Sequence, residues 1–278
     1  MNGTFTVTDG AQVTIHTCTA PEEGWMITSR LIELPTQLIL ADTPLRPDSA
    51  NEVLTHAKDL GKPISRVYIS HSHPDHLAGA GPAGAPLYAL PAVAAAINNG
   101  GGAIIRGALT LTGHGRIEPG RLPRIGHHVA AGEDRIDGAR VRFEPVSNAE
   151  GSEQLTIGFP GDGILIVQDP AYNPVHAFLG EQHSDGWLAV IAALEARSYP
   201  YAAILPGHGL PGARGLYGDA RACLTAAPAL GRRGRWPRRP QPAPGNGVPG
   251  YGGTTMRPLQ NYFPHPGPSL THSHEQPG

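Results

Sequence analysis

The sequence predicts an α/β protein, and three observations predict that class. The first 42 residues contain short runs rich in β-branched and apolar residues, separated by turn-forming residues. From residue 49 onwards, helical patterns alternate with short apolar strands. The chain has 278 residues, of which 40% are hydrophobic, and that is enough for one large domain with a sizeable core.

The N-terminal part of the chain is expected to form five strands and one helix. The helix is indicated by a periodic segment that ends at Gly61, with Pro63 just beyond. The fourth strand ends on a carboxylate, Asp42, and the fifth runs directly into a histidine cluster. The expected strands cover residues 5–8, 13–17, 26–34, 37–42 and 66–70, and the expected helix covers residues 49–60.

The alternation of strands and helices continues in the second part of the chain. Residues 98–102 are rich in Asn and Gly and predict a flexible turn. Residues 109–132 lack a clear period, so we expect a long loop near a site. The remaining strands are expected at residues 86–90, 139–145, 154–159, 163–168 and 201–205, and the remaining helices at 91–97, 187–196 and 215–226.

Composition changes sharply at Gly231. Residues 231–278 contain ten prolines and nine glycines in 48 positions, too many for a packed element, and six arginines against one acid, Glu275. We therefore expect one folded domain over residues 1–230, followed by a disordered tail over residues 231–278.

The net charge limits the kinds of binding partner that we expect, and the cysteines and the N-terminal sequence indicate the cellular compartment. The formal net charge is -2, so neither nucleic acid nor an anionic membrane is an expected partner. Cys18 and Cys223 match no zinc or redox motif and are expected to be reduced thiols. No apolar run approaches 18 residues, and the N-terminus lacks a secretory pattern. We therefore expect a cytoplasmic protein.

Potential metal ligands are concentrated in the sequence His71-Ser72-His73-Pro74-Asp75-His76. His71 and His73 stand two apart, so both imidazoles point to the same side of an extended segment. Pro74 ends the strand and can open a helical turn, after which Asp75 and His76 can face a second point beside the first. Three imidazoles and one carboxylate are ligands that zinc prefers. The cluster therefore predicts a metal site.

With the preceding strand and the small-residue run Leu77-Ala78-Gly79-Ala80-Gly81, this cluster closely resembles the signature of metallo-β-lactamase-fold hydrolases. The resemblance implies a four-layer αββα sandwich of two internal repeats, with two metal ions at one edge between the sheets. It extends over roughly residues 5–230, and outside the cluster it depends on short motifs.

Three further positions match motifs of that family. Asp42 ends an apolar strand, where the family carries an aspartate that supports the metal loop by hydrogen bonds rather than binding metal. Asp169 follows a buried apolar strand and matches the carboxylate that bridges the two metals. His208 lies in Pro206-Gly207-His208-Gly209 and matches the family's last histidine ligand.

The chain departs from the family at the third motif, where most members carry a histidine. Residues 146–155 contain no histidine, and Glu150 is the best replacement, with Glu153 as the competing choice. The spacing from Glu150 to Asp169 resembles that of the alkylsulfatase branch, which uses a glutamate ligand there. Glutamate is a harder donor than imidazole, so it could shift the metal preference from zinc towards iron or manganese.

The resemblance implies a complete two-metal site. Asp75 is also expected to orient the attacking oxygen. His176, seven residues after Asp169, is a candidate proton donor to the leaving group, or a loop histidine without a role, and Tyr172 and Asn173 are weaker candidates for that pocket. The implied ligands are His71, His73 and Glu150 for one metal, Asp75, His76 and His208 for the other, and Asp169 as the bridge.

The expected function is hydrolysis of an ester-type small molecule by hydroxide held between two divalent metal ions, zinc by first choice. Sulfate esters, phosphate esters, thioesters and lactones are all possible substrates. One alternative is an iron-dependent oxidoreductase of the same fold, similar to a persulfide dioxygenase. Another is a non-catalytic binding protein that retains the fold. The oligomeric state stays open.

Overall fold

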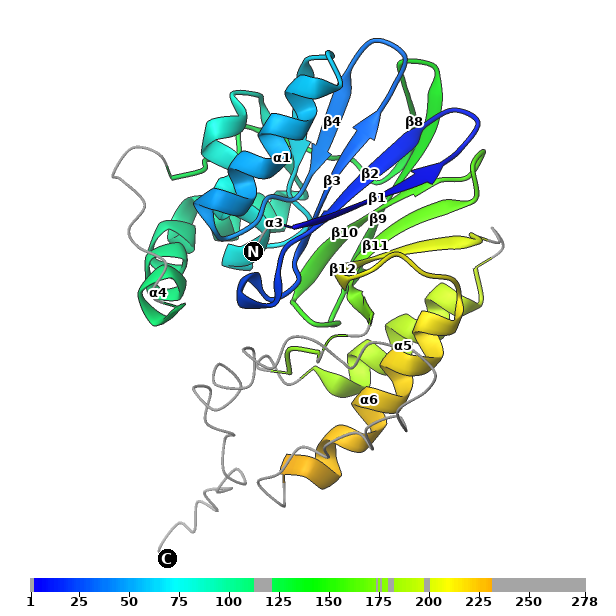
Figure 1. Ribbon diagram of the computed structural model, residues 1–278. Helices are drawn as coiled ribbons and strands as arrows, with labels where there is room; N and C mark the ends of the chain where they lie inside the picture. Colours follow the sequence, from blue (N-terminus) through cyan, green and yellow to red (C-terminus); the bar gives the residue numbers. More distant parts are fainter. Residues whose placement is uncertain are drawn as a thin grey trace, which may run out of the picture.

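The computed structural model describes residues 3–112, 122–173, 175, 177–179, 183–197 and 201–231. Two β-sheets lie face to face in the middle of the molecule, and helices cover the outer side of each sheet (Figure 1). The predicted α/β class and its four-layer αββα arrangement are therefore confirmed. Residues 232–278 of the predicted tail lie outside the described residues.

The first sheet contains seven strands in the order of the sequence. Its strands β1 to β4 are antiparallel to one another, and those from β4 to β7 are parallel. The strands are β1 (Thr4–Asp9), β2 (Thr14–Thr19), β3 (Thr28–Glu33), β4 (Leu38–Ala41), β5 (Ile64–Tyr68), β6 (Leu87–Ala89) and β7 (His127–His128).

The second sheet contains five strands in the order β12-β11-β10-β9-β8, and only the pair formed by β11 and β12 is parallel. Nearly every residue of β11 is buried, because the strand is covered by the first sheet on one face and by helices on the other. The strands are β8 (Gly132–Ile136), β9 (Ala139–Ser147), β10 (Glu153–Phe159), β11 (Ile164–Asn173) and β12 (Ala203–Gly209).

Helices pack on both outer faces. On the first sheet, α1 begins at Pro47, which suits the first helical turn, and buries Val53 and Ala57. On the second sheet, α5 and α6 bury Trp187 and Tyr217. The helices are α1 (Pro47–Asp59), α2 (Pro74–Leu77), α3 (Pro91–Ala96), α4 (Gly102–Thr112), α5 (Ser184–Glu195) and α6 (Gly215–Gly231). Among the described residues, no helix is long and apolar enough to cross a membrane.

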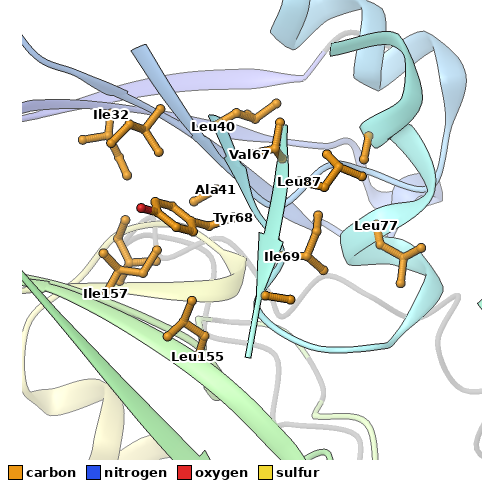
Figure 2. Close-up of a cluster of buried hydrophobic side chains, with 14 of the residues drawn as sticks. Ile32, Leu40, Ala41, Val67, Tyr68, Ile69, Leu77, Leu87, Leu155 and Ile157 are labelled. Atoms are coloured by element: carbon orange, nitrogen blue, oxygen red, sulfur yellow. The ribbon is translucent and has the colours of Figure 1, made fainter. Parts of the chain in front are cut away.

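The main core lies between the two sheets and beneath the first helical layer. Figure 2 shows Tyr68 of β5 on the side of Leu155 and Ile157 of β10, whereas Ile69 lies on the side of Leu77. Ile69 directly follows β5, and successive residues of an extended segment point to opposite faces, so this short segment contributes to both layers. Full burial of one such apolar side chain stabilises the fold by about 1.5–3 kcal/mol.

One expectation for residues 98–132 is wrong, and a second is contradicted over part of its range. Residues 98–102 are helical rather than a flexible turn, because a π-helix at Ile97–Gly101 joins α3 to α4 without a break. Ile105 and Leu109 of α4 are buried in the core, and this burial outweighs the low helix propensity of the glycines. The expected loop over 109–132 is helical up to Thr112 and contains β7, and residues 113–121 lie outside the described residues.

Candidate metal centre

The histidine cluster lies at the end of β5, at the edge where the two sheets meet. His73 is extended (φ -68°, ψ 141°), and Pro74 starts the short helix α2 directly after it. The chain direction changes at this point, so Asp75 and His76 face a different position from His71. His71, Asp75 and His76 are buried, and the side chain of His73 is 17% exposed.

One group of possible metal ligands consists of His71, His73 and Glu150, whose donor atoms lie within 4.8 Å of one another. His73 Nδ1 is 2.9 Å from Glu150 Oε1, and His71 Nε2 is 3.5 Å from Glu150 Oε2. Glu150 reaches them from the turn between β9 and β10, and it is buried. Glu153 is the first residue of β10 and belongs to no such group among the described residues.

A second group consists of Asp75, His76 and His208, whose donor atoms also lie within 4.8 Å of one another. His208 Nε2 is 3.5 Å from Asp75 Oδ2. His208 belongs to β12 of the second sheet, whereas Asp75 and His76 belong to α2, which follows β5 of the first sheet.

Asp169 lies between the two groups. Its Oδ1 is 3.3 Å from His76 Nε2, and its Oδ2 is 3.4 Å from His208 Nε2 and 3.9 Å from His71 Nε2. The approach depends on Gly207, because a Cβ at that position would lie 1.7 Å from Asp169 Oδ1. The glycine before His208 therefore makes room for the carboxylate.

Several donor atoms of the centre are buried without a hydrogen bond from another described group. They are Nε2 of His71, His76 and His208, and Oδ1 of Asp169. Leaving a buried polar atom unsatisfied costs about 1–3 kcal/mol. Four such atoms that converge on one small region fit a site for cations, and nitrogen and carboxylate oxygen are the donors that divalent zinc, iron and manganese accept.

The other ring nitrogen of each buried histidine is held by the protein. His76 Nδ1 is 2.8 Å from Asp42 Oδ2, and His208 Nδ1 donates to the carbonyl oxygen of Trp25 at 2.8 Å. His71 Nδ1 is 2.9 Å from the hydroxyl of Ser70, which itself donates to Asp42 Oδ2. With the proton on Nδ1, each Nε2 presents a lone pair to the centre.

Asp42 occupies the position at which the family resemblance implies a supporting residue. It lies outside the two groups that Asp169 joins, but with His71 and His76 it forms a third group whose donor atoms lie within 4.8 Å of one another. It accepts hydrogen bonds from the Ser70 amide, the Ser70 hydroxyl and Gln168 Nε2. Gln168 in turn accepts from Arg30 Nη1 at 2.8 Å, and Arg30 Nη2 donates to the carbonyl of Pro206. Arg30 is fully buried, and burial lowers its pKa to about 9, against the attraction of Asp42 and Asp169. The guanidinium therefore stays charged at neutral pH.

Burial and mutual charge perturb the pKa values inside the centre. Burial raises the pKa of Glu150 to about 7, although the nearby His73 opposes the shift. Burial disfavours the ionised form of Asp169, but the charges of His76 and His208 outweigh this and hold its pKa well below the usual value. Burial also lowers the pKa of His71 well below its usual value. Bound cations would replace the protons that this cluster otherwise shares.

Tyr172 is more closely connected to the centre than the sequence indicates. Its hydroxyl donates to Asp169 Oδ2 at 2.9 Å, and its ring stacks on His208 with centroids 4.9 Å apart. Asn173, the other weaker candidate, donates instead to the carbonyl of Leu210. His176 lies outside the described residues.

Sequence reasoning missed Arg30, Gln168, Gln154 and Trp25. The signal for two of them was available, because Arg30 and Gln168 are long polar residues within segments expected to be strands, where a buried polar group needs a partner. Trp25 contributes only a backbone carbonyl, which no residue pattern identifies.

Comparison with known proteins gives structural neighbours only. No protein-family model matches the chain, and no curated protein matches it. A metallo-beta-lactamase from Pontibacter korlensis is similar in structure, with a TM-score of 0.60 and 19% identity, over 80% of this chain and 99% of that chain. The FIM-1 metallo-beta-lactamase from Pseudomonas aeruginosa in a mono-zinc form is also similar, with a TM-score of 0.58 and 18% identity, over 82% of this chain and 96% of that one.

A metallo-beta-lactamase from Erythrobacter litoralis gives a TM-score of 0.58 at 17% identity, over 81% of this chain and 96% of that one. Identities this low establish the fold rather than the activity. The chain therefore adopts the metallo-β-lactamase fold.

Proposed function

We propose that the protein is a metal-dependent hydrolase of an ester-type small molecule. One observation carries the proposal: two groups of buried histidine and carboxylate donors are joined by Asp169, and four of their donor atoms converge without a hydrogen bond. The proposed ligands are His71, His73 and Glu150 for one cation, Asp75, His76 and His208 for the other, and Asp169 for both.

Zinc is the first choice of cation for these donors, with iron or manganese as alternatives. When bound, a pair of divalent cations lowers the pKa of a shared water and stabilises negative charge on the substrate oxygen. Asp42, Ser70 and the Trp25 carbonyl orient the histidines for this purpose.

Asp75 is the best candidate to orient the attacking water and accept its proton. Its side chain is 8% exposed, against 1% for both Glu150 and Asp169, so it is the carboxylate nearest to solvent. His176 stays our candidate for protonating the leaving group, since it follows Asp169 by seven residues.

The proposed substrates are sulfate esters, phosphate esters, thioesters and lactones. Glu150 among the donors supports the comparison with the alkylsulfatase branch, which resembles this chain in having a glutamate ligand at this position. Most members of the fold carry a neutral imidazole there. Phe178 lies edge-on to His73, with ring centroids 5.6 Å apart. An apolar ring beside the most exposed histidine of the two donor groups supports a substrate with an apolar portion.

Metal quantification on purified protein, followed by a screen of the four substrate classes, tests the proposal. We expect two equivalents of divalent metal and hydrolysis of at least one class. His73→Ala should lose most metal and activity, whereas His128→Ala should lose neither, because His128 is exposed on β7 and belongs to neither donor group. Protein that binds no divalent metal in any supplemented medium would exclude the proposed function.

A second candidate is an iron-dependent oxidoreductase, such as a persulfide dioxygenase. Three of the seven proposed ligands are carboxylates, one more than in a set with histidine in place of Glu150, and the additional oxygen donor favours iron. Iron as the bound metal, oxygen consumption with a persulfide and no ester hydrolysis would favour this candidate. Bound metal with neither reaction would indicate a binding protein.

A further inference from the structure

Gln154 is a buried amide that touches the candidate metal centre without belonging to it. It is the second residue of β10, fully buried, and its Nε2 donates to Glu150 Oε2 at 3.0 Å. The backbone of β10 is anchored beside the histidine cluster, because the Leu155 amide donates to the carbonyl of Ser70 at 2.9 Å. Gln154 therefore holds a defined position relative to His71.

We propose that Gln154 is a positioning residue that holds the Glu150 carboxylate in one orientation, with one oxygen engaged by the amide and the other facing His73, and so sets the strength and metal preference of the His71–His73–Glu150 site. This inference depends on the proposed function, because it assumes that the site binds a cation.

The two oxygens of Glu150 have different surroundings. Oε1 is 2.9 Å from His73 Nδ1, whereas Oε2 accepts the Gln154 amide and lies 3.5 Å from His71 Nε2. The terminal torsion of a glutamate is broad, so the plane of an unsupported carboxylate samples a wide range of orientations. A hydrogen bond to Oε2 removes that freedom and leaves Oε1 directed at His73.

An amide suits this task better than a charged donor. Lysine or arginine would orient the carboxylate, but it would also add positive charge where a cation has to bind. The neutral amide of Gln154 directs the oxygen and leaves the negative charge of Glu150 for the metal.

A buried glutamine at position 154 is unfavourable for the stability of the fold. Its Oε1 is buried and makes no hydrogen bond to another described group. An unsatisfied buried oxygen is unfavourable, and a purely structural role is served better by an apolar residue of similar volume. The contact from Nε2 to Glu150 is the described interaction that distinguishes glutamine from such a residue.

The test measures metal affinity rather than activity. Metal-free protein is titrated with Zn²⁺ and with Mn²⁺ in competition with a chromophoric chelator, for the wild type and for Gln154→Met. Methionine keeps the length of the side chain and removes the donor. We expect binding at one of the two sites to weaken by about 10- to 100-fold, with the other site unchanged. The ratio of Zn²⁺ to Mn²⁺ affinity at the weakened site should also change.

A matched control is Thr156→Val. Thr156 lies on the same strand, and its hydroxyl donates to the carbonyl of Glu144 rather than to a residue of the centre. Its loss should leave both affinities unchanged. Gln154→Leu is the second variant, in case the methionine variant fails to fold, and circular dichroism verifies the fold of each protein.

A double-mutant cycle separates positioning from general support of the fold. In a Glu150→His background, Gln154→Met should have no further effect on affinity, because an imidazole has no second oxygen to direct. The same loss in both backgrounds, or unchanged affinity in Gln154→Met and Gln154→Leu, would overturn the inference and leave the proposed function standing. Wild-type protein without measurable affinity for either cation would overturn both.

Discussion

Arg30 donates a hydrogen bond from Nη1 to Oε1 of Gln168 at 2.8 Å, and this contact joins the two sheets inside the protein. Gln168 extends the connection by donating to Asp42, which holds His76. A fully buried guanidinium of this kind is unusual, because its desolvation is costly unless hydrogen bonds and negative charges compensate. The stability of the fold should therefore be sensitive to the loss of this cation.

Arg30→Met should lower the free energy of unfolding by about 3–5 kcal/mol, because Asp42 and Gln168 would keep their buried polar groups without the compensating cation. Urea denaturation followed by circular dichroism measures the change. Arg135→Met is the control, since Arg135 is exposed on β8, and it should stay within about 0.5 kcal/mol of the wild type. Equal stability of the two variants would contradict this account of Arg30.

Tyr172→Phe should weaken metal binding by about 10- to 100-fold while the fold is retained, because it removes the hydrogen bond to Asp169 and keeps the ring that stacks on His208. Competition titration with Zn²⁺ gives the affinity. Tyr217→Phe removes a hydroxyl from a buried tyrosine of the same core cluster and should leave the affinity unchanged. A similar affinity in all three proteins would mean that the hydroxyl does not support the centre.

Gly207→Ala should displace Asp169 and abolish most metal binding, because the new methyl group would overlap Oδ1 of the carboxylate. Metal content after purification in supplemented medium is the measurement. Gly218→Ala is the matched control, since a methyl group at that position of α6 would meet no atom within 4 Å. That control should keep its metal and gain up to about 1 kcal/mol of stability from helix propensity. Full metal content in Gly207→Ala would place Asp169 outside the centre.

Glu33→Gln tests a charge cluster away from the centre. Glu33 pairs with Lys62 and His16, and hydrogen bonds from both hold its pKa below the usual value. A depressed carboxyl pKa contributes stability above the unfolded pKa of 4.5, and this contribution is lost as the pH falls through the folded pKa. The carboxylate is partly exposed to solvent, so we expect a loss of about 0.2–1 kcal/mol at pH 7.

The unfolding free energies of wild type and Glu33→Gln should converge as the pH falls below 4, which urea denaturation at several pH values measures. A constant difference between the two proteins from pH 7 to pH 3 would contradict the assignment.

The sequence by itself determined every described strand except β7 and β8, most of the helices and the order of the possible ligands. The reason is local: the histidine cluster directly follows a strand and contains a proline, Asp42 directly follows an apolar run, and Asp169 follows one after a single glutamine. Such patterns can be recognised because hydrophobic periodicity and proline act on neighbouring residues. The sequence also left the third motif open between Glu150 and Glu153, since both stand in one short polar stretch.

Only the tertiary structure decided which contacts form between segments that are far apart in the sequence. The turn after β9 directs Glu150 towards His73, while Glu153 becomes the first residue of β10. Burial of Ile105 and Leu109 made one continuous helical segment from residues expected to form a turn and a loop. The contact between Arg30 and Gln168 spans 138 residues, and its free energy depends on a low dielectric and on specific partners that exist only after the sheets have packed.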